Sequence, residues 1–146
     1  MIKPLPLLFA FLLASTAFAR SALAEGPTGL DGEPSSTSVI VSFPDRSTVF
    51  SPTPEQASVL AGAKDAAMIS IRGRTSSPRS NAKGEGVALA RALAARSYLV
   101  ARGVSPLKIS VNFASAADFI ADNSTAEGRI KNQRAEVELI FVSAPE

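Results

Sequence analysis

Residues Asn123–Leu139 read NSTAEGRIKNQRAEVEL, a helix-forming pattern followed at once by a strand-forming one. Ser124 and Glu127 have the spacing of a capping box, which predicts that a short helix starts here. From Ala135 to Phe141 apolar residues alternate with polar ones, which predicts a strand with one buried face. The polar residues between the two patterns form either a solvated surface loop or one wall of a binding site.

The same signals recur upstream of this stretch. Two further helices are predicted, one capped by Thr53 and ending near Ala66, and a longer one at about Glu85–Arg102 that Gly103 ends. The remaining strands are predicted at Ser38–Phe43, Met68–Arg72 and Leu107–Phe113. The order is therefore β-α-β-α-β-α-β. It predicts an α/β sandwich, a four-stranded mixed sheet with helices on one face.

The long helix carries an arginine in an unusual position. Apolar residues are predicted to cover about half of its circumference, at Val87, Leu89, Leu93, Ala94, Tyr98 and Val100. Arg91 lies at the edge of this arc. Its guanidinium either lies along the core margin with its charge in water or faces a cleft at the start of the helix.

The first residues of the 146-residue chain have the layout of a secretory signal peptide. Lys3 precedes an apolar run, and two small-x-small motifs follow as alternative cleavage sites, Ala17-Phe18-Ala19 and Ala22-Leu23-Ala24. The run is shorter than the roughly 20 residues of a spanning helix, so we expect no retained transmembrane segment. The domains are then a signal peptide (1–24), a flexible leader rich in Gly, Pro, Ser and Thr (25–37) and one folded domain (38–143).

The composition excludes most catalytic chemistry. The chain has no Cys and no His, which argues against a disulfide scaffold, a lipid-modified Cys and the usual zinc sites. No pair of acids and no Ser with an obvious base is visible. We therefore predict a non-enzymatic protein without metal or cofactor, located in an exported compartment, most simply a bacterial periplasm.

Positive charge is concentrated between residues 72 and 102. This stretch has one acid, Glu85, and one aromatic residue, Tyr98, so it offers no stacking platform for nucleic acid. We predict no nucleic-acid partner. The stretch is either a solvated basic face or a contact for an anionic polymer of the cell envelope. Its cations are Arg72, Arg74, Arg79, Lys83, Arg91, Arg96 and Arg102.

Two segments are candidates for a binding site. Arg91 can grip a carboxylate with two parallel hydrogen bonds. Thr75, Ser76 and Ser77 provide hydroxyl and backbone N–H groups close to the start of the long helix. Together they suit a small anionic or zwitterionic ligand. The alternative is that Arg91 only pairs with a local acid or a helix carbonyl.

The chain resembles the OmpA-like C-terminal domain, the peptidoglycan-binding module of outer-membrane proteins and of flagellar and secretion machinery. The resemblance spans about Val39 to Phe141. It is carried by Asp122–Arg129, Asn132–Glu136, Val41–Phe43, Ser47, Ile71-x-Gly73-x-Thr75, Arg91-Ala92, Tyr98-Leu99 and Gly103-Val104. It implies a domain of the periplasm associated with the outer membrane and the cell wall.

The resemblance also implies a ligand, the stem peptide of peptidoglycan held at its diaminopimelate residue. Arg91 is then the carboxylate partner, with Thr75 beside it. Ser76 stands where the family has the Asp that holds the ammonium, a loss worth about 2–5 kcal/mol for a partly buried charge pair. Glu85 and Asp118 are the acids that could replace it. Two further departures are Arg74 in place of a His, which would repel the ammonium, and Gly84 in place of an Asn.

The polar residues of the opening stretch are expected to fix the loop and border the cleft. They are Asn123, Arg129, Asn132 and Arg134, with Gln133 replacing one of the family's paired arginines.

Two functions remain open. The first is a peptidoglycan-associating domain that tethers an envelope component to the wall. The second is a degenerate OmpA-like fold that serves as a protein-docking accessory module of a type IV secretion or conjugation apparatus. The first needs Arg91 in a cleft. The second needs an exposed apolar patch, around Phe50 or around Phe119 and Ile120.

Overall fold

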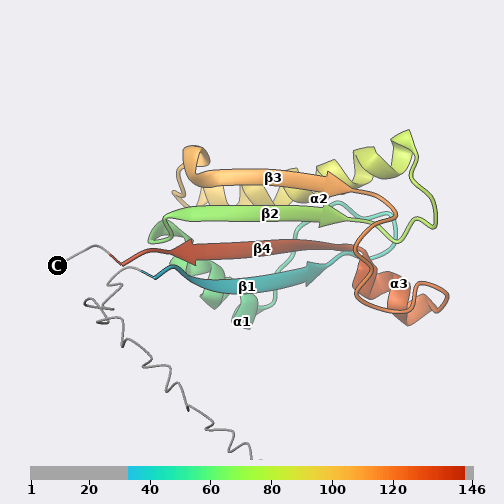
Figure 1. The fold of residues 1–146 in the computed structure, drawn as a ribbon, viewed down its shortest axis with the longest axis horizontal. Helices are drawn as coiled ribbons and strands as arrows, with labels where there is room; N and C mark the ends of the chain where they lie inside the picture. Colours follow the sequence, from blue (N-terminus) through green and yellow to red (C-terminus); the bar gives the residue numbers. More distant parts are fainter. Residues whose placement is uncertain (1–32, 144–146) are drawn as a thin grey trace, which may run out of the picture. The chain divides into compact units, whose positions relative to one another are not determined.

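The computed structural model describes residues 33–143 of the chain. Its centre is one four-stranded sheet with the strand order β1-β4-β2-β3 (Figure 1). β1 and β2 both run antiparallel to β4, and β2 and β3 are parallel. The predicted four-stranded mixed sheet is therefore confirmed. The strand bounds are β1 Ser35–Ser42, β2 Met68–Arg74, β3 Ile109–Ala114 and β4 Arg134–Phe141.

The helices also follow the predicted order. α1 (Pro54–Leu60) and α2 (Ala82–Ala101) lie on one face of the sheet, and α3 (Ala126–Asn132) lies at the end where β4 begins (Figure 1). Short 3-10 turns follow α1 at Ala61–Lys64 and precede β3 at Pro106–Lys108. In the described part of the chain, no helix combines the length and the apolar character that a membrane crossing requires.

Of the predicted N-terminal segments, only the last residues of the leader belong to the described part of the chain. The predicted signal peptide (1–24) and most of the predicted leader (25–37) lie outside the described residues. β1 begins at Ser35, three residues before the predicted start, because Ser35–Thr37 pair with Leu139–Phe141 of β4. These small polar residues have little strand propensity of their own, so their strand conformation comes from the pairing.

The start of α1 is confirmed, whereas its predicted end is wrong. The Thr53 hydroxyl accepts a hydrogen bond from the Gln56 amide, and the Gln56 side chain accepts one from the Thr53 amide, which completes the capping box. The α-helix ends at Leu60 and continues as a 3-10 turn to Lys64, so it does not reach Ala66. This tighter turn satisfies the last carbonyl groups of the helix.

Two predicted helix starts were wrong. α2 begins at Ala82 rather than near Glu85, because the Asn81 side chain accepts a hydrogen bond from the Gly84 amide at 2.8 Å and caps the helix there. α3 is capped by Thr125, not by Ser124. Ser124 instead donates its amide and hydroxyl to the carboxylate of Asp122.

Most of the predicted buried face of α2 was wrong, although Tyr98 does pack against the core. Leu93 is 43% exposed, and the buried stripe consists of small residues and one leucine, Ala88, Ala92, Ala95 and Leu99. The helix lies so close to β2 that a Cβ at Gly73 would overlap the Ala88 carbonyl and lie 3.0 Å from the Cβ of Ala92. Small side chains are needed at this distance, so larger apolar residues lie on the flanks. Phe113, predicted to face inward, is 41% exposed on the edge strand β3.

The topology gathers the loops at one end of the sheet. β1, β2 and β3 all end there, and β4 begins there (Figure 1). The turn after β1, the loop after β2, the start of α2 and the residue before β4 are therefore brought together. These segments are far apart in the sequence.

Candidate ligand-binding site

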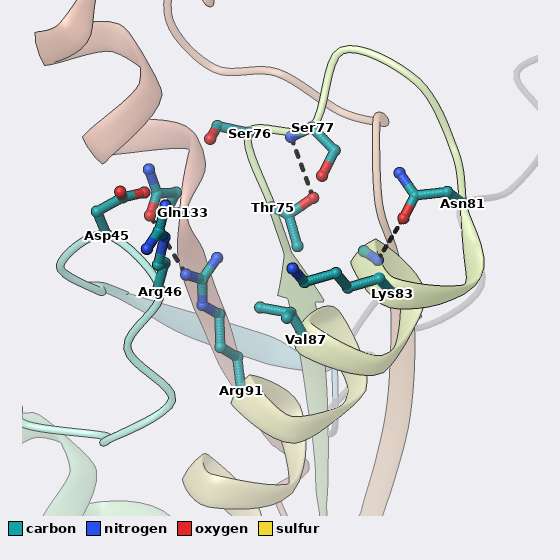
Figure 2. A pocket seen from close by; sticks show the side chains of 11 residues that line it. Asp45, Arg46, Thr75, Ser76, Ser77, Asn81, Lys83, Val87, Arg91 and Gln133 are labelled. Carbon is teal, nitrogen blue, oxygen red and sulfur yellow. Dashed lines mark hydrogen bonds between the residues drawn. The ribbon is translucent and has the colours of Figure 1, made fainter.

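A pocket of about 220 Å³ opens at this end of the sheet (Figure 2). Its lining comes from the turn after β1, the loop after β2, the first turns of α2 and the residue before β4. The structure thus brings together the three predicted contact residues, Thr75, Ser76 and Arg91. The full lining is Asp45, Arg46, Thr75, Ser76, Ser77, Asn81, Lys83, Gly84, Val87, Arg91 and Gln133.

Arg91 is held in place at the base of this pocket. Its side chain is only 2% exposed. Nε donates to the Ser47 carbonyl at 3.0 Å, Nη1 to the Arg74 carbonyl at 3.1 Å and Nη2 to the Gln133 side-chain oxygen at 3.3 Å. A guanidinium has five N–H groups, so the bonds within residues 33–143 leave one N–H on Nη1 and one on Nη2. Those two donors can serve a carboxylate.

The charge of Arg91 is not neutralised by a direct ion pair within residues 33–143, where the ion pairs involve other groups. Its partners are neutral oxygens, and its guanidinium lies 5.2 Å from the centre of the Phe43 ring. Burial lowers the pKa of Arg91, and the negative charge of Asp45 acts in the opposite direction. A buried cation with neutral partners attracts an anion from the open side of the pocket.

The other charges of the pocket are also mostly positive. Arg46 and Lys83 line it together with Arg91, whereas Asp45 is the only acid of the lining (Figure 2). Arg46 has a φ of 60°, a left-handed conformation that is uncommon for a residue other than glycine. This turn is fixed from below by the bond from Arg91 to the Ser47 carbonyl. Strained backbone of this kind often lies at binding sites.

The loop after β2 forms a compact wall of the pocket. The Thr75 hydroxyl accepts a hydrogen bond from the Ser77 amide at 3.2 Å, so it shapes the turn in which Ser76 lies. A Cβ on Gly84 would lie 2.9 Å from the Cβ of Ser115 and 3.0 Å from the Ser77 hydroxyl. A larger residue at the start of α2 would push this wall outward, which accounts for glycine at that position.

Of the four predicted flanking residues, Asn123 bonds directly to the pocket wall, and the other three form hydrogen bonds outside the lining. Asn123 donates to the Ser76 carbonyl at 2.9 Å and accepts a hydrogen bond from Asn132 at 3.1 Å. Arg129 donates to the carbonyls of Asn123 and Ser124. Arg134 is 1% exposed and donates to the carbonyls of Asp118 and Asn132 and to the carboxylate of Glu136. None of the four is part of the lining, so any direct role in binding stays a prediction.

The two acids considered as substitutes for the missing Asp lie elsewhere. Asp118 pairs with Arg74 at 2.7 Å, and Glu85 binds the backbone and hydroxyl of Ser115. Arg74 is buried, pairs with Asp118 and does not line the pocket, so the repulsion of a ligand ammonium by Arg74 stays a prediction. The acid that does reach the pocket is Asp45.

The contribution of the Glu85 hydrogen bonds to stability can be tested by varying the pH. Hydrogen bonds from the Ser115 hydroxyl, the Ser115 amide and the Ser80 hydroxyl lower its pKa below the ordinary value of 4.5. A carboxylate with a lowered pKa contributes stability at pH values above 4.5, and this contribution is lost as the pH falls through the lowered pKa. We expect Glu85→Gln to unfold at a lower temperature than wild type at neutral pH. The difference should shrink as the pH decreases below 4.5, and a difference that does not change with pH would contradict this role of Glu85.

The basic stretch between residues 72 and 102 is not one continuous surface. Arg72 pairs with Glu136 and Glu138, and Arg102 stacks on the ring of Tyr98 at 3.4 Å from its centre. Only Lys83 and Arg91 of its cations line the pocket. The other cations of the stretch, among them Arg79 and Arg96, lie outside the pocket lining.

The pocket also contains residues that the sequence did not single out, Asp45, Arg46 and Asn81. A Pro-Asp-Arg-Ser turn directly after a strand is a common loop composition and carries no functional signal by itself. The topology, in contrast, does indicate where this turn lies. The strands β1 and β2 point the same way, so the turn after β1 must lie at the same end as the Thr75–Ser77 loop.

Residues 44–133 match the OmpA family. The chain is 31% identical over 109 residues to a Brucella suis protein named as a candidate outer membrane lipoprotein of a type IV secretion system. The aligned residues make up 73% of this chain and 63% of that protein. It is 34% identical over 86 residues to outer membrane protein A of Bordetella avium, covering 59% of this chain and 44% of that protein. The chain thus spans less than two thirds of the length of either relative.

Solved structures share the fold at lower identity. The peptidoglycan-associated lipoprotein from Burkholderia pseudomallei superposes with a TM-score of 0.59 at 18% identity, over 69% of this chain and 88% of that one. The structure described as the cell wall anchor of the T6SS from Pseudomonas aeruginosa gives a TM-score of 0.56 at 20% identity, over 77% of this chain and 88% of that one. The architecture is therefore shared across proteins of very different sequence.

Proposed function

Because the chain belongs to the OmpA family, we propose that it is a non-enzymatic periplasmic domain that associates with peptidoglycan and tethers an envelope component to the cell wall. Arg91 binds a carboxylate of the stem peptide, and Thr75 and Ser76 contact the adjacent polar groups. The names of the Brucella suis relative and of the Pseudomonas aeruginosa structure favour a secretion apparatus as the tethered component.

One observation carries this proposal, the position of Arg91. It is almost fully buried, and its partners among residues 33–143 are neutral and leave one N–H on each terminal nitrogen for a ligand. No acid within residues 33–143 forms a direct ion pair with this guanidinium, so its positive charge stays available to an anion. The guanidinium lies at the base of an open pocket whose walls carry two further cations.

Co-sedimentation with purified insoluble peptidoglycan tests the proposal. We expect wild type to sediment with the wall and Arg91→Ala to lose at least about tenfold in affinity, since it removes the main carboxylate partner. Arg96→Ala is the matched control, because Arg96 is on the same helix but does not line the pocket. Wild type that stays in the supernatant would overturn the proposal.

Arg91→Ala also removes three hydrogen bonds inside the protein, so its thermal unfolding is measured in parallel. Lys83→Ala separates binding from folding. Lys83 is an exposed residue of the pocket, so we expect weaker sedimentation at unchanged stability. Equal sedimentation of Lys83→Ala and wild type would argue against this pocket as the wall contact.

The docking function has a specific observation in its favour. Phe119 is 41% exposed and Ile120 is 52% exposed, in the loop between β3 and α3. Phe50, the other predicted patch, is partly buried and stacks between Phe43 and Tyr98, so it offers no patch. If wild type fails to sediment, a variant with Phe119→Ser and Ile120→Ser should lose association with partner proteins while keeping its fold.

A further inference from the structure

We propose that the domain has a further binding site, at the opposite end of α2 from the pocket at Arg91, for an acidic peptide segment of a partner protein that inserts one apolar side chain. The proposal does not depend on the proposed function, because the two sites share no lining residue. The site is a pocket of about 310 Å³ lined by Leu60, Ala61, Lys64, Arg102 and Val104.

The pocket lies where α1 and α2 both end. Leu60, Ala61 and Lys64 belong to α1 and its 3-10 continuation, shortly before β2 begins. Arg102 caps the end of α2, and Val104 follows it on the way to β3. The first pocket is instead lined by the opening turns of α2, so the helix separates the two sites (Figure 1). Both sites can therefore be occupied at once.

The floor of this pocket is apolar. Leu60 and Val104 are buried members of the hydrophobic core, and Ala61 contributes only a methyl group at the side. The volume is at the lower end of the range for ligand pockets, roughly 300–1,000 Å³. It suits one apolar side chain and is too small for a long acyl chain. Placing an apolar side chain here removes apolar surface from water, which favours binding.

The rim of the pocket carries two cations and no acid. They are Lys64 and Arg102, and neither forms an ion pair within residues 33–143. They lie close together, since a Cβ on Gly103 would be 3.7 Å from Nζ of Lys64. Lys108 donates to the Lys64 carbonyl at 3.0 Å, which brings a third cation to the same place. Neighbouring cations repel one another, and a carboxylate between them relieves this repulsion.

The acid nearest to these cations in the sequence is Asp65. It does not line the pocket and forms no ion pair within residues 33–143. Asp65, Lys64 and Arg102 are all exposed, so water screens the three charges alike. With Asp65 counted in full, three cations still face one acid. The pocket therefore favours an acidic ligand over a basic one.

Arg102 also has a role in the fold, but this role uses few of its donors. It stacks on the ring of Tyr98, and its Nη1 donates to the Tyr98 carbonyl at 3.1 Å. One of its five guanidinium N–H groups is thus used within residues 33–143. The carbonyls of Leu99 and Val100 accept backbone amides of residues 102–104. The end of α2 is therefore hydrogen-bonded without the Lys64 ammonium.

An NMR titration of the isotope-labelled protein with three acetylated tripeptide amides tests the site. The first peptide has a leucine between two glutamates, the second a leucine between two glutamines, and the third a glycine between two glutamates. We expect the first to shift the amide signals of Ala61, Lys64, Gly103 and Val104. The second should bind about threefold more weakly or worse, because two screened charge contacts are lost. The third should bind about tenfold more weakly or worse, because the apolar side chain is lost. Equal affinities, or no shifts at these residues with the first peptide, would overturn the proposal.

The double variant Lys64→Gln, Arg102→Gln tests which charges attract the peptide. We expect it to bind the glutamate and glutamine peptides with leucine equally, a comparison made within one protein and so independent of its stability. Arg79→Gln is the matched control, because Arg79 is exposed and lines neither pocket. It should keep the preference of wild type. A double variant that still prefers the glutamate peptide would overturn the role of these two cations.

Vesicles of phosphatidylglycerol test the competing occupant, an anionic membrane surface. We expect wild type not to co-sediment with them. Vesicle binding that requires Lys64 and Arg102, without any tripeptide binding, would overturn the peptide proposal in favour of a lipid. Sedimentation with peptidoglycan should be the same for wild type and the double variant, because both residues lie outside the pocket at Arg91. The failure of either proposal is therefore seen separately.

Discussion

Replacing Gly73 with alanine is expected to lower the free energy of unfolding by about 3 kcal/mol or more. The added methyl group would overlap the carbonyl of Ala88, which is backbone and cannot rotate away, and would press on Ala92. α2 would have to move off β2, taking Arg91 with it. Chemical denaturation of wild type and variant measures the change. For a domain of this size the loss corresponds to a decrease in melting temperature of about 12 °C or more.

Gly86→Ala is the matched control for this experiment. Gly86 lies in the same helix, and a Cβ there would have no neighbour within 4 Å. Alanine favours the helix over glycine by about 0.5–1 kcal/mol, so this variant should be slightly more stable than wild type. A Gly73→Ala variant as stable as wild type would show that the helix and sheet do not pack as closely as described.

Asn132→Ala is expected to cost about 3 kcal/mol of unfolding free energy. Asn132 is fully buried, and its side-chain oxygen accepts from the amides of Ile120 and Ala121. Its nitrogen donates to the Ala121 carbonyl and to Asn123, which in turn holds the Ser76 carbonyl. Alanine leaves these groups without partners, so the pocket wall should loosen as well. Thermal unfolding and sedimentation with peptidoglycan together measure both effects.

Lys131→Ala shows whether the effect is specific to the buried amide. Lys131 is next to Asn132 in the same helix and pairs with Glu127 at 2.8 Å, but both side chains are mostly exposed. An exposed pair at this spacing contributes about 0.5 kcal/mol or less. If Asn132→Ala lowered the free energy of unfolding no more than Lys131→Ala, the hydrogen bonds of the Asn132 amide would not be what holds the loop before α3 in place.

Much of this fold could be predicted because it is encoded locally. The alternation in Ala135–Phe141 and the Thr53–Gln56 capping box depend on neighbouring residues only, and both were found as predicted. The buried face of α2 could not be predicted, because alanines and Leu99 form it, while Leu93 is exposed. The packing distance is set instead by Gly73, a residue of another element.

The candidate site was only partly predictable for the same reason. Arg91 was recognised from its place at the edge of an apolar arc, yet its burial depends on Phe43, Ser47 and Gln133, which are distant in sequence. Asp45 was missed, because a turn residue after a strand carries no signal until the topology places it beside the Thr75–Ser77 loop. Local patterns thus predict elements, while the charges of a pocket depend on the tertiary arrangement.

The most direct test of the central claim is a titration of the isotope-labelled protein with a soluble peptidoglycan stem-peptide fragment, followed by NMR. The claim is that the pocket at Arg91 binds the wall. It predicts that amide signals of Thr75, Ser76 and Gln133 shift on addition of the fragment, together with the side-chain signals of Arg91. Shifts confined to the surface around Phe119 and Ile120, or no shifts at saturating fragment, would contradict it.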